Sequence, residues 1–355
     1  MTIDFLIIGQ GLAGSLLAWE LINRGCKVII VDNDKENASQ IAAGLINPVT
    51  GMRFVKSTNV DDLLPTAKQC YAQLDTIFQQ TFYVEKPMLR LFNSDNELTQ
   101  CLHRIKEADY FNYLGAITRS DPNIKNLVTP FGFLEQLQTG FLSTQPLLSC
   151  LKEFFIAKGS YRQAEINYQD ICIFPTLRWK NIYPKRIIFC EGHHVSKNPW
   201  FNWLPFQPVK GEILTLEHHS QLPDKIINFQ HWMIPLNNQK IRVGATFDRE
   251  NINSIPTEQG KNNLLKTLHS ISPKLRPTLL NHKANIRPCT LDKQPFIGHH
   301  PQYSQLSIFN GFGAKGSLQI PWYSQQFTES LLHNTSVPST IQRHYATHFT
   351  AKHRS

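Results

Sequence analysis

The amino-acid sequence predicts an α/β protein built on a parallel sheet, with a mostly β segment inserted into it. Roughly the first thirty residues read as strand, helix and strand, which is the βαβ unit of a parallel sheet with a right-handed crossover. The stretch from Pro205 to about Asn281 is instead rich in short strand-like runs. Helical and strand-like segments then alternate again to the end of the chain.

Length and composition support this prediction. The chain has 355 residues, of which 41% are hydrophobic, and such a length suits two domains or one large α/β domain with an insert. Seven cysteines are scattered without a C-x-x-C pair, which indicates reduced thiols in a cytoplasm. Lys and Arg number 36 against 27 Asp and Glu, a net charge of +9, which favours an anionic cofactor, an acidic substrate or nucleic acid.

The apolar N-terminus does not read as a signal peptide, because Asp4 comes early and glycines interrupt the apolar run. No run approaches the roughly 18 apolar residues of a membrane span. We therefore expect a soluble, cytoplasmic protein that does not associate with a membrane.

The first elements follow one another closely. Ile3–Ile8 is an apolar run ended by glycine and predicts a short buried strand. A helix is expected from about Ala13 to Arg24, ended by Gly25, and a second strand at Lys27–Val31. Further helices are expected at 61–80, 140–158, 260–269 and 321–332, and further strands at 165–168, 187–189, 212–216 and 240–246.

The spacing Gly9-x-Gly11-x-x-Gly14 lies between the first strand and the first helix. These glycines allow a tight turn, a close approach of backbone to a pyrophosphate and close packing of helix on strand, while the helix N-terminus attracts the phosphates. Asp32 ends the second strand, where a carboxylate binds a ribose hydroxyl and disfavours a 2′-phosphate. A coincidental glycine turn is the alternative. The expected dinucleotide contacts here are Gly9, Gly11, Leu12, Ala13, Gly14, Asp32 and Asn33.

The turn alone fits FAD or NAD, and two other segments favour FAD. Ala38–Gly44 is a stretch of small residues that ends in glycine soon after the second strand, where backbone can pass close to a flat ring. Gly311–Gly316 forms a second glycine loop before the last helix. A cofactor held from both ends of the chain is expected.

The chain at this point resembles the D-amino-acid oxidase family of flavoproteins, the group that contains glycine oxidase and monomeric sarcosine oxidase. The resemblance covers nearly the whole chain in separated blocks. It includes the N-terminal unit with 42–44, the strand 187–193, the run 208–212 that is similar to the family's P-[VI]-[RK]-G-[QE], then 243–246, 286–298 and 311–316.

The resemblance implies a Rossmann-like FAD-binding domain with a mostly β substrate domain inserted. It places residues 1–80, 140–205 and 283–335 in the FAD-binding domain, 81–139 and 206–282 in the substrate domain, and 336–355 in a basic tail. FAD is expected to be non-covalent, because Cys289 is out of register with the family's flavin-linked cysteine. The further FAD contacts implied are Ala42, Ala43, Gly44, Gly192, Gly311, Gly313, Ala314, Lys315 and Gly316.

The family transfers a hydride from a carbon that bears an amine to flavin N5, so its sites need a cation for a substrate carboxylate rather than an acid–base triad. Arg287 matches the family arginine of the R-P-x-T-x-D block, and a guanidinium can hold a carboxylate with two parallel bonds. Its alternative is a surface arginine paired with Asp292. Lys315 falls where glycine oxidase carries a second carboxylate-binding arginine, and its alternative role is a positive charge near the flavin.

Three more residues are candidates for the substrate site. Trp232 matches an active-site tyrosine of glycine oxidase, and a core tryptophan is the alternative. Arg242 falls near a lysine that activates oxygen in sarcosine oxidase, and it points away from its neighbours Ile241 and Val243 on a strand; an outward arginine is the alternative. Arg53 follows the small-residue stretch and is expected to meet an anionic substrate.

Three functions remain open at this stage. The first is oxidation of the C–N bond of a small amine or amino acid. The second follows from a further resemblance, to the FAD domain of the bifunctional bacterial enzyme that removes a carboxymethyl group from wobble uridine, so that tRNA would be the substrate. The third is a non-catalytic flavin-binding module. Adjacent histidine pairs such as His193-His194 are poor joint ligands on a strand, so no metal is expected.

Overall fold

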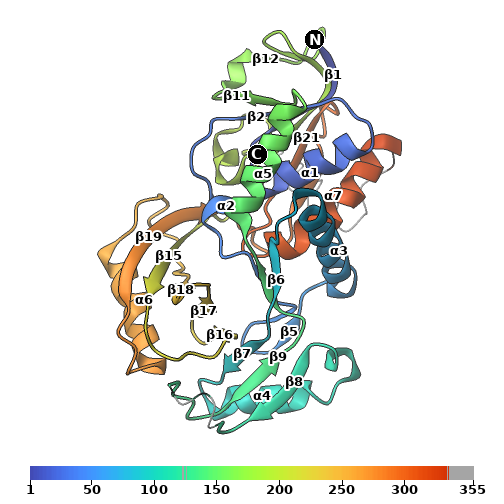
Figure 1. Ribbon diagram of the computed structural model, residues 1–355. Coiled ribbons are helices and arrows are strands. Elements are labelled where there is room, and N and C mark those ends of the chain that lie inside the picture. Colours follow the sequence, from blue (N-terminus) through green and yellow to red (C-terminus); the bar gives the residue numbers. More distant parts are fainter. Residues whose placement is uncertain (122–123, 125, 334, 336–355) are drawn as a thin grey trace.

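The computed structural model describes residues 1–121, 124, 126–333 and 335. Two large sheets organise the chain, one of six strands and one of eight (Figure 1). The six-stranded sheet lies beside helices α1, α5 and α7, and the eight-stranded sheet lies apart from them with α6 on its outer side. The predicted α/β class, with a parallel sheet and a second β-rich region, is confirmed.

The six-stranded sheet is parallel except at one edge. Its order is β11 (Tyr161–Gln163), β2 (Val28–Asp32), β1 (Thr2–Ile8), β14 (Tyr183–Phe189), β21 (Leu306–Asn310) and β20 (Phe296–His299). Only β20 runs antiparallel to its neighbour. Both faces of β1 and β2 are covered, which is why these strands read as continuous apolar runs rather than as alternating ones.

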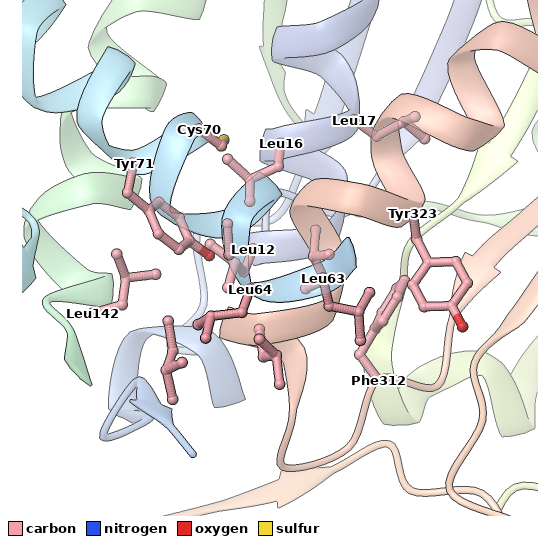
Figure 2. Close-up of a cluster of buried hydrophobic side chains, with 14 of the residues drawn as sticks. Leu12, Leu16, Leu17, Leu63, Leu64, Cys70, Tyr71, Leu142, Phe312 and Tyr323 are labelled. Carbon is pink, nitrogen blue, oxygen red and sulfur yellow. The ribbon is translucent and has the colours of Figure 1, made fainter. Parts of the chain in front are cut away.

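One face of this sheet carries the main helices α1 (Leu12–Asn23), α3 (Val60–Phe78), α5 (Thr144–Ala157) and α7 (Gly316–His333). Figure 2 shows their shared core, where Leu12 and Leu16 of α1 meet Leu63 of α3 and Tyr323 of α7. The other face is covered by a second apolar cluster, to which η4 (Gly192–Lys197) and the strands β12 (Ile171–Cys172) and β13 (Arg178–Trp179) contribute.

The eight-stranded sheet is antiparallel apart from the β16–β7 pair. Its order is β19 (Thr278–Arg287), β15 (Val209–Glu217), β18 (Lys240–Gly244), β17 (Trp232–Pro235), β16 (Ile226–Asn228), β7 (Met88–Leu91), β9 (Phe133–Gln136) and β8 (Leu114–Thr118). One face packs its aliphatic residues against α6 (Glu258–Ile271). Because side chains alternate along a strand, the opposite face receives the polar residues.

The remaining elements are short and connect the two sheets. The strands β3 (Leu45–Ile46), β10 (Gly140–Leu142) and β6 (Tyr83–Glu85) form a small sheet, and β4 (Val49–Thr50) pairs with β5 (Val55–Lys56) as a hairpin. The helices among these remaining elements are α2 (Ala38–Ile41), α4 (Asp95–Arg104), η1 (Ala108–Tyr110) and η3 (Tyr168–Asp170).

Three expected elements differ in the structure. The helix expected at 140–158 begins only at Thr144, because Gly140–Leu142 pairs as β10. The strand expected at 165–168 is wrong, since the edge strand β11 lies before it. The last helix begins at Gly316 and runs through Pro321. Proline has no N–H for the carbonyl of Ser317, and the hydroxyl of Tyr71 donates to that carbonyl instead, at 2.7 Å.

The proposed division of the chain into domains stays a prediction. Its boundary at residue 283 falls within β19, a strand of the eight-stranded sheet. The basic tail 336–355 lies outside the described residues. In the part of the chain that the structure describes, no helix is both long and apolar enough to cross a membrane. All seven cysteines are free thiols.

Candidate functional site

A cavity of about 1600 Å³ lies between the two sheets. It begins at the carboxyl ends of β1, β2 and β14, which is where open α/β sheets bind their ligands. It then extends along the polar face of the eight-stranded sheet to Trp232 and Arg287, with Lys315 on its wall. This volume exceeds the roughly 300–1,000 Å³ of ordinary small-molecule pockets and has room for a dinucleotide together with a substrate.

The glycine turn suits a dinucleotide because side chains at two of its glycine positions would block the close packing of the turn. A Cβ atom on Gly9, which has a φ of +104°, would lie 2.6 Å from the carbonyl oxygen of Cys190, and one on Gly14 would lie 1.9 Å from that of Gly9. These two glycines therefore let α1 and β14 approach the turn. Gly11 has room, with only the Ser39 hydroxyl near it, and it faces the cavity. No acidic residue stands in the first turn of α1 to compete with a phosphate.

Asp32 lies at the end of β2 and reaches back to the glycine turn. Its two carboxylate oxygens accept hydrogen bonds from the backbone N–H groups of Gln10, at 2.7 Å, and Asp34, at 2.8 Å. Burial raises the pKa of this carboxyl, and the two backbone bonds oppose that rise. The carboxylate is thus held rigidly at the cavity wall, as binding of a ribose hydroxyl requires.

The small-residue stretch Ala42–Gly44 forms another part of the wall. Gly44 has a φ of +68°, and a Cβ atom there would lie 1.9 Å from the carbonyl oxygen of Leu142, so only glycine fits. The N–H of Leu142 donates to the Gly44 carbonyl at 2.9 Å, and the Thr144 hydroxyl donates to the Ala42 carbonyl at 3.2 Å. The stretch is therefore fixed from the side of β10 and α5.

The second glycine loop brings Lys315 to the wall from the far end of the chain. Its Nζ donates to the buried hydroxyl of Ser57 at 2.9 Å. Burial lowers the pKa of Lys315, and the nearby charge of Lys293, which also lines the cavity, lowers it further. Gly313 and Ala314 line the cavity beside Lys315, whereas Gly311 does not.

Arg287 ends β19 and lies across the neighbouring strand. Its Nη2 donates to the carbonyl of Thr246 at 2.6 Å, and a Cβ atom on Gly211 would meet the same Nη2 at 2.1 Å. Burial lowers the pKa of the guanidinium. The ion pairs described in the structure join Arg287 to no carboxylate, including Asp292. Two of its neighbours, Gly211 and Ala245, line the cavity with it.

Trp232 lies on the same face of the sheet, two strands from β15. Its ring covers Gly244, where a Cβ atom would lie 2.8 Å from the Trp232 Cζ2 atom. The residue is partly buried and lines the cavity. It contributes an aromatic wall on the side of the cavity where Arg287 lies.

Arg53 and Arg242 are placed differently from the other candidates. Arg53 is exposed at the tip of the β4–β5 hairpin and lines the mouth of the cavity, and its carbonyl accepts a hydrogen bond from Arg104 at 3.2 Å. Arg242 does not line the cavity. Its guanidinium lies behind the wall and donates to the carbonyls of Ile41 and Ala42.

Most sequence-predicted site residues thus meet at one cavity. Those that line it are Gly9, Gly11, Leu12, Ala13, Asp32, Asn33, Ala42, Ala43, Gly44, Arg53, Gly192, Trp232, Arg287, Gly313, Ala314, Lys315 and Gly316. The three that do not are Gly14, Gly311 and Arg242. A Cβ atom on Gly311, which has a φ of +89°, would lie 2.9 Å from Thr290 Cγ2, so this glycine serves the loop's own packing.

Sequence reasoning missed a polar group at the substrate end. Arg90 is 6% exposed, pairs with Glu97 through Nη2 at 2.6 Å and lies 4.0 Å from the centre of the Phe54 ring. It lines the cavity together with Asn228, its register partner on β16. In the sequence, Arg90 is noticeable only as an arginine among the apolar residues of 88–91. The pairing of β7 with β16 is what places Arg90 at this site.

A second missed group lies at the opposite end, beside Gly192. The carboxyl of Glu191 accepts hydrogen bonds from the hydroxyl of Tyr168 and from Asn198 Nδ2, both at 2.7 Å. Burial raises the pKa of Glu191 to about 7, and the two hydrogen bonds oppose that rise. Glu191 and Tyr168 line the cavity.

Among the described residues, no three His, Cys, Asp or Glu side chains gather as a ligand set. His193 and His194 lie with their ring centres 4.0 Å apart.

The glycine turn, the Asp32 carboxylate and the long cavity together are the features of a protein that binds a dinucleotide. Residues 4–330 match the family described as FAD dependent oxidoreductase (DAO). The chain belongs to this family, its relatives are enzymes, and the predicted resemblance is confirmed. The cofactor of the family is FAD, which the glycine turn and the second glycine loop fit.

Curated relatives fall into two groups. The chain is 23% identical, over 93% of its length, to the tRNA 5-methylaminomethyl-2-thiouridine biosynthesis bifunctional protein MnmC of Marinobacter nauticus. It is 26% identical to glycine oxidase of Bacillus licheniformis, over 42% of its length. The chain spans about half the length of the MnmC proteins, 56% of the one from Marinobacter nauticus.

Solved structures agree on the fold. Glycine oxidase from Bacillus cereus superposes with a TM-score of 0.82 at 21% identity, covering 94% of this chain and 96% of that one. Iminodiacetate oxidase from Chelativorans superposes with a TM-score of 0.78 at 19% identity, covering 94% of this chain and 96% of that one. At this identity the likeness establishes the fold alone, a mixed α/β fold with a β-rich second region.

Proposed function

We propose that the chain uses FAD to oxidise the C–N bond of an amine or amino acid that carries a carboxylate. The observation that carries this proposal is Arg287, a largely buried guanidinium on the cavity wall that is paired with no carboxylate among the described ion pairs. A buried cation is costly without a counter-charge, and a substrate carboxylate would supply one. The names of the glycine oxidase and iminodiacetate oxidase relatives support this class of substrate.

Each wall residue has a role in this proposal. Arg287 binds the carboxylate and fixes its orientation, while Trp232, on the same side of the cavity, packs against the substrate and excludes water. Lys315, held by Ser57, adds a second positive charge to the site. Bound FAD supplies the acceptor for the hydride that leaves the carbon next to nitrogen. The protein contributes binding and orientation, which together keep the reacting carbon in place.

The decisive experiment is anaerobic bleaching of the flavin absorbance by glycine, sarcosine, proline, iminodiacetate and D-amino acids. We expect at least one carboxylate amine to bleach the flavin. Arg287→Ala should retain FAD and slow bleaching by roughly a hundredfold or more, since charged hydrogen bonds are lost. Arg178→Ala serves as the control, because Arg178 is exposed on β13 and does not line the cavity. Equal bleaching rates in Arg287→Ala and the parent would refute the carboxylate role.

We infer that FAD is bound without a covalent link. Cys289 lies near the second glycine loop, with its Sγ 3.3 Å from where a Cβ atom of Gly313 would be, and burial raises the pKa of its thiol. A thiol that stays protonated is a poor nucleophile. Acid precipitation should therefore release all the flavin into the supernatant, whereas yellow precipitated protein would contradict the inference.

A second candidate substrate is a carboxymethylaminomethyl uridine in tRNA. The same oxidation would convert its C–N bond to an imine, and water would then hydrolyse the imine, releasing the carboxymethyl group as glyoxylate and leaving an aminomethyl uridine. The observation that favours it is Phe247, whose ring is 62% exposed beside the site. The ring centre lies 5.9 Å from the guanidinium carbon of Arg287 and 5.2 Å from that of Arg249. Exposed aromatic rings flanked by arginine are surfaces on which nucleobases stack. The MnmC relatives and the net charge of +9 are consistent with this substrate.

The two candidates separate in one comparison. If the small amines leave the flavin oxidised while tRNA with the modified uridine bleaches it, the second candidate holds. In that case Phe247→Ala should weaken tRNA binding, and the binding should fall as salt rises. Phe174→Ala is a matched control, because this ring is 66% exposed and belongs to the β12–β13 connection.

A further inference from the structure

Arg242 is a half-buried arginine that touches the wall of the proposed FAD site from behind. It lies on β18 with its side chain on the cavity side of the eight-stranded sheet, the face it shares with its register partners Thr215 and Ile234. Its Nη1 donates to the Ala42 carbonyl at 3.1 Å, and its Nη2 donates to the carbonyl of Ile41. The described ion pairs include none to Arg242, and its Nε has no hydrogen-bond partner.

The segment that Arg242 holds is the cavity wall Ile41–Gly44. From the other side Thr144 and Leu142 hold the same segment, through the carbonyls of Ala42 and Gly44. The carbonyl of Ala42 thus accepts hydrogen bonds from both sides. The short helix α2 and this wall are fixed between the two parts of the fold, with Arg242 as the anchor on the eight-stranded sheet.

The arginine at this position carries a cost for the fold. A guanidinium without a carboxylate loses its hydration, and two carbonyl dipoles compensate that loss only in part. Burial accordingly lowers its pKa to about 10. An apolar side chain would avoid the buried charge, but it would leave the carbonyl of Ile41 without its donor. The two donors at position 242 therefore hold the wall, and the charge comes with them.

We propose that Arg242 is a positioning residue, which fixes the Ala42–Gly44 wall for FAD and supplies an uncompensated positive charge behind that wall. Two consequences follow. A wall held by two donors is pre-organised, so FAD binds without ordering it first. A fixed positive charge near the site also favours the reduced, more negative form of the cofactor. This inference rests on FAD binding and is independent of which amine is the substrate.

The test compares three variants of the full chain. Arg242→Met removes the donors and the charge, and Arg242→Lys keeps the charge but loses the paired donors. Arg186→Met is the matched control, because Arg186 is also a half-buried arginine with a pKa lowered by burial that donates to a backbone carbonyl, that of Ser304 at 2.6 Å. Arg186 does not line the cavity. The readouts are the FAD dissociation constant, hydrogen exchange of residues 38–46 and the flavin midpoint potential.

We expect Arg242→Met to raise the FAD dissociation constant about tenfold or more, to speed hydrogen exchange in 38–46 and to shift the midpoint potential to more negative values. Arg242→Lys should restore the potential while exchange stays faster than in the parent. If Arg242→Met does not fold, the proposal is tested by the hydrogen exchange and the FAD affinity of Arg242→Lys alone. The proposal is overturned if the Arg242 variants match Arg186→Met in FAD affinity and exchange.

Discussion

The guanidinium of Arg287 occupies the space in which residue 211 would carry a side chain, because a Cβ atom on Gly211 would lie 2.1 Å from Arg287 Nη2. The two residues lie on the adjacent strands β19 and β15, where Val209 is the register partner of Arg287. Glycine in the strand therefore permits the close approach of the arginine to the sheet. The position of Arg287, the proposed carboxylate-binding group, therefore depends on a glycine of the neighbouring strand.

Gly211→Ala should displace Arg287 without removing its charge. The new methyl group would clash with the flexible end of Arg287, which moves more easily than backbone, so the fold and FAD binding should persist. We expect the KM for a carboxylate substrate to rise roughly 10- to 100-fold, as loss of a charged hydrogen bond predicts. Steady-state kinetics test this, with the flavin spectrum as control. An unchanged KM would show that Arg287 does not depend on Gly211.

Two glycines of the first turn should respond differently to alanine. Gly14→Ala should prevent folding or FAD loading, because its Cβ atom would lie 1.9 Å from the backbone carbonyl of Gly9. Gly11→Ala should fold, since its nearest neighbour is the Ser39 hydroxyl at 3.2 Å, but its methyl group would narrow the cavity and weaken FAD. Soluble yield, circular dichroism and FAD titration distinguish the two. A folded, yellow Gly14→Ala protein would contradict the packing argument.

The buried charge cluster around Glu212 should matter for stability. Glu212 accepts hydrogen bonds from His282 Nε2 at 2.7 Å and from Thr257, and it lies 3.6 Å from the fully buried Lys210. Glu212→Ala removes the ion-pair partner of Lys210 and should cost about 3–5 kcal/mol, measured by denaturant unfolding. The exposed Glu258, which pairs with Lys261, offers a control. Glu258→Ala should cost at most about 1 kcal/mol, and an equal loss in both variants would argue against the cluster.

The carboxyl of Glu191 should make stability depend on pH. Its pKa in the folded chain, about 7, lies above the ordinary value of 4.5, so the folded state binds the proton more tightly than the unfolded state. The associated stabilisation is complete below about pH 4.5 and is lost as pH rises through about 7. Glu191→Gln, which mimics the protonated form, should remove this slope and add about 1–3 kcal/mol above pH 7.

The measurement for Glu191 is urea unfolding from pH 5 to pH 8, made with and without FAD. Asn198 and Tyr168 can both bond to a glutamine at 191, since a hydroxyl donates or accepts, so the variant should fold. Parallel pH profiles for Glu191→Gln and the parent would exclude Glu191 as the source of the slope.

The sequence alone predicted the βαβ unit at one end of the cavity. The turn at Gly9–Gly14, the strand that ends in Asp32 and the helix between them are local features, read from spacing and from apolar runs over about thirty residues. The structure describes them close to the expected bounds, with β1 at Thr2–Ile8 and α1 at Leu12–Asn23.

The substrate end could not be assembled from sequence in the same way. Arg90 of β7 pairs with Glu97 of α4, and Arg90 reaches the cavity only because β7 pairs with β16, more than a hundred residues later. Which distant strand pairs with β7 is set by the whole sheet. A shift of one residue in the register of that pairing would turn Arg90 to the opposite face. Periodicity within one segment does not carry this information.

Sequence determined that this protein has a βαβ unit for a dinucleotide, and its spaced blocks identified the family. The tertiary structure determined where the side chains of the two strand arginines lie. Arg287 and Arg242 look alike as charged residues within strands, yet the glycine at 211 lets one lie along the cavity wall, while the carbonyls of Ile41 and Ala42 hold the other behind it. The physical reason is that a side chain's role depends on partners from distant strands, and those partners meet only when the sheets pack.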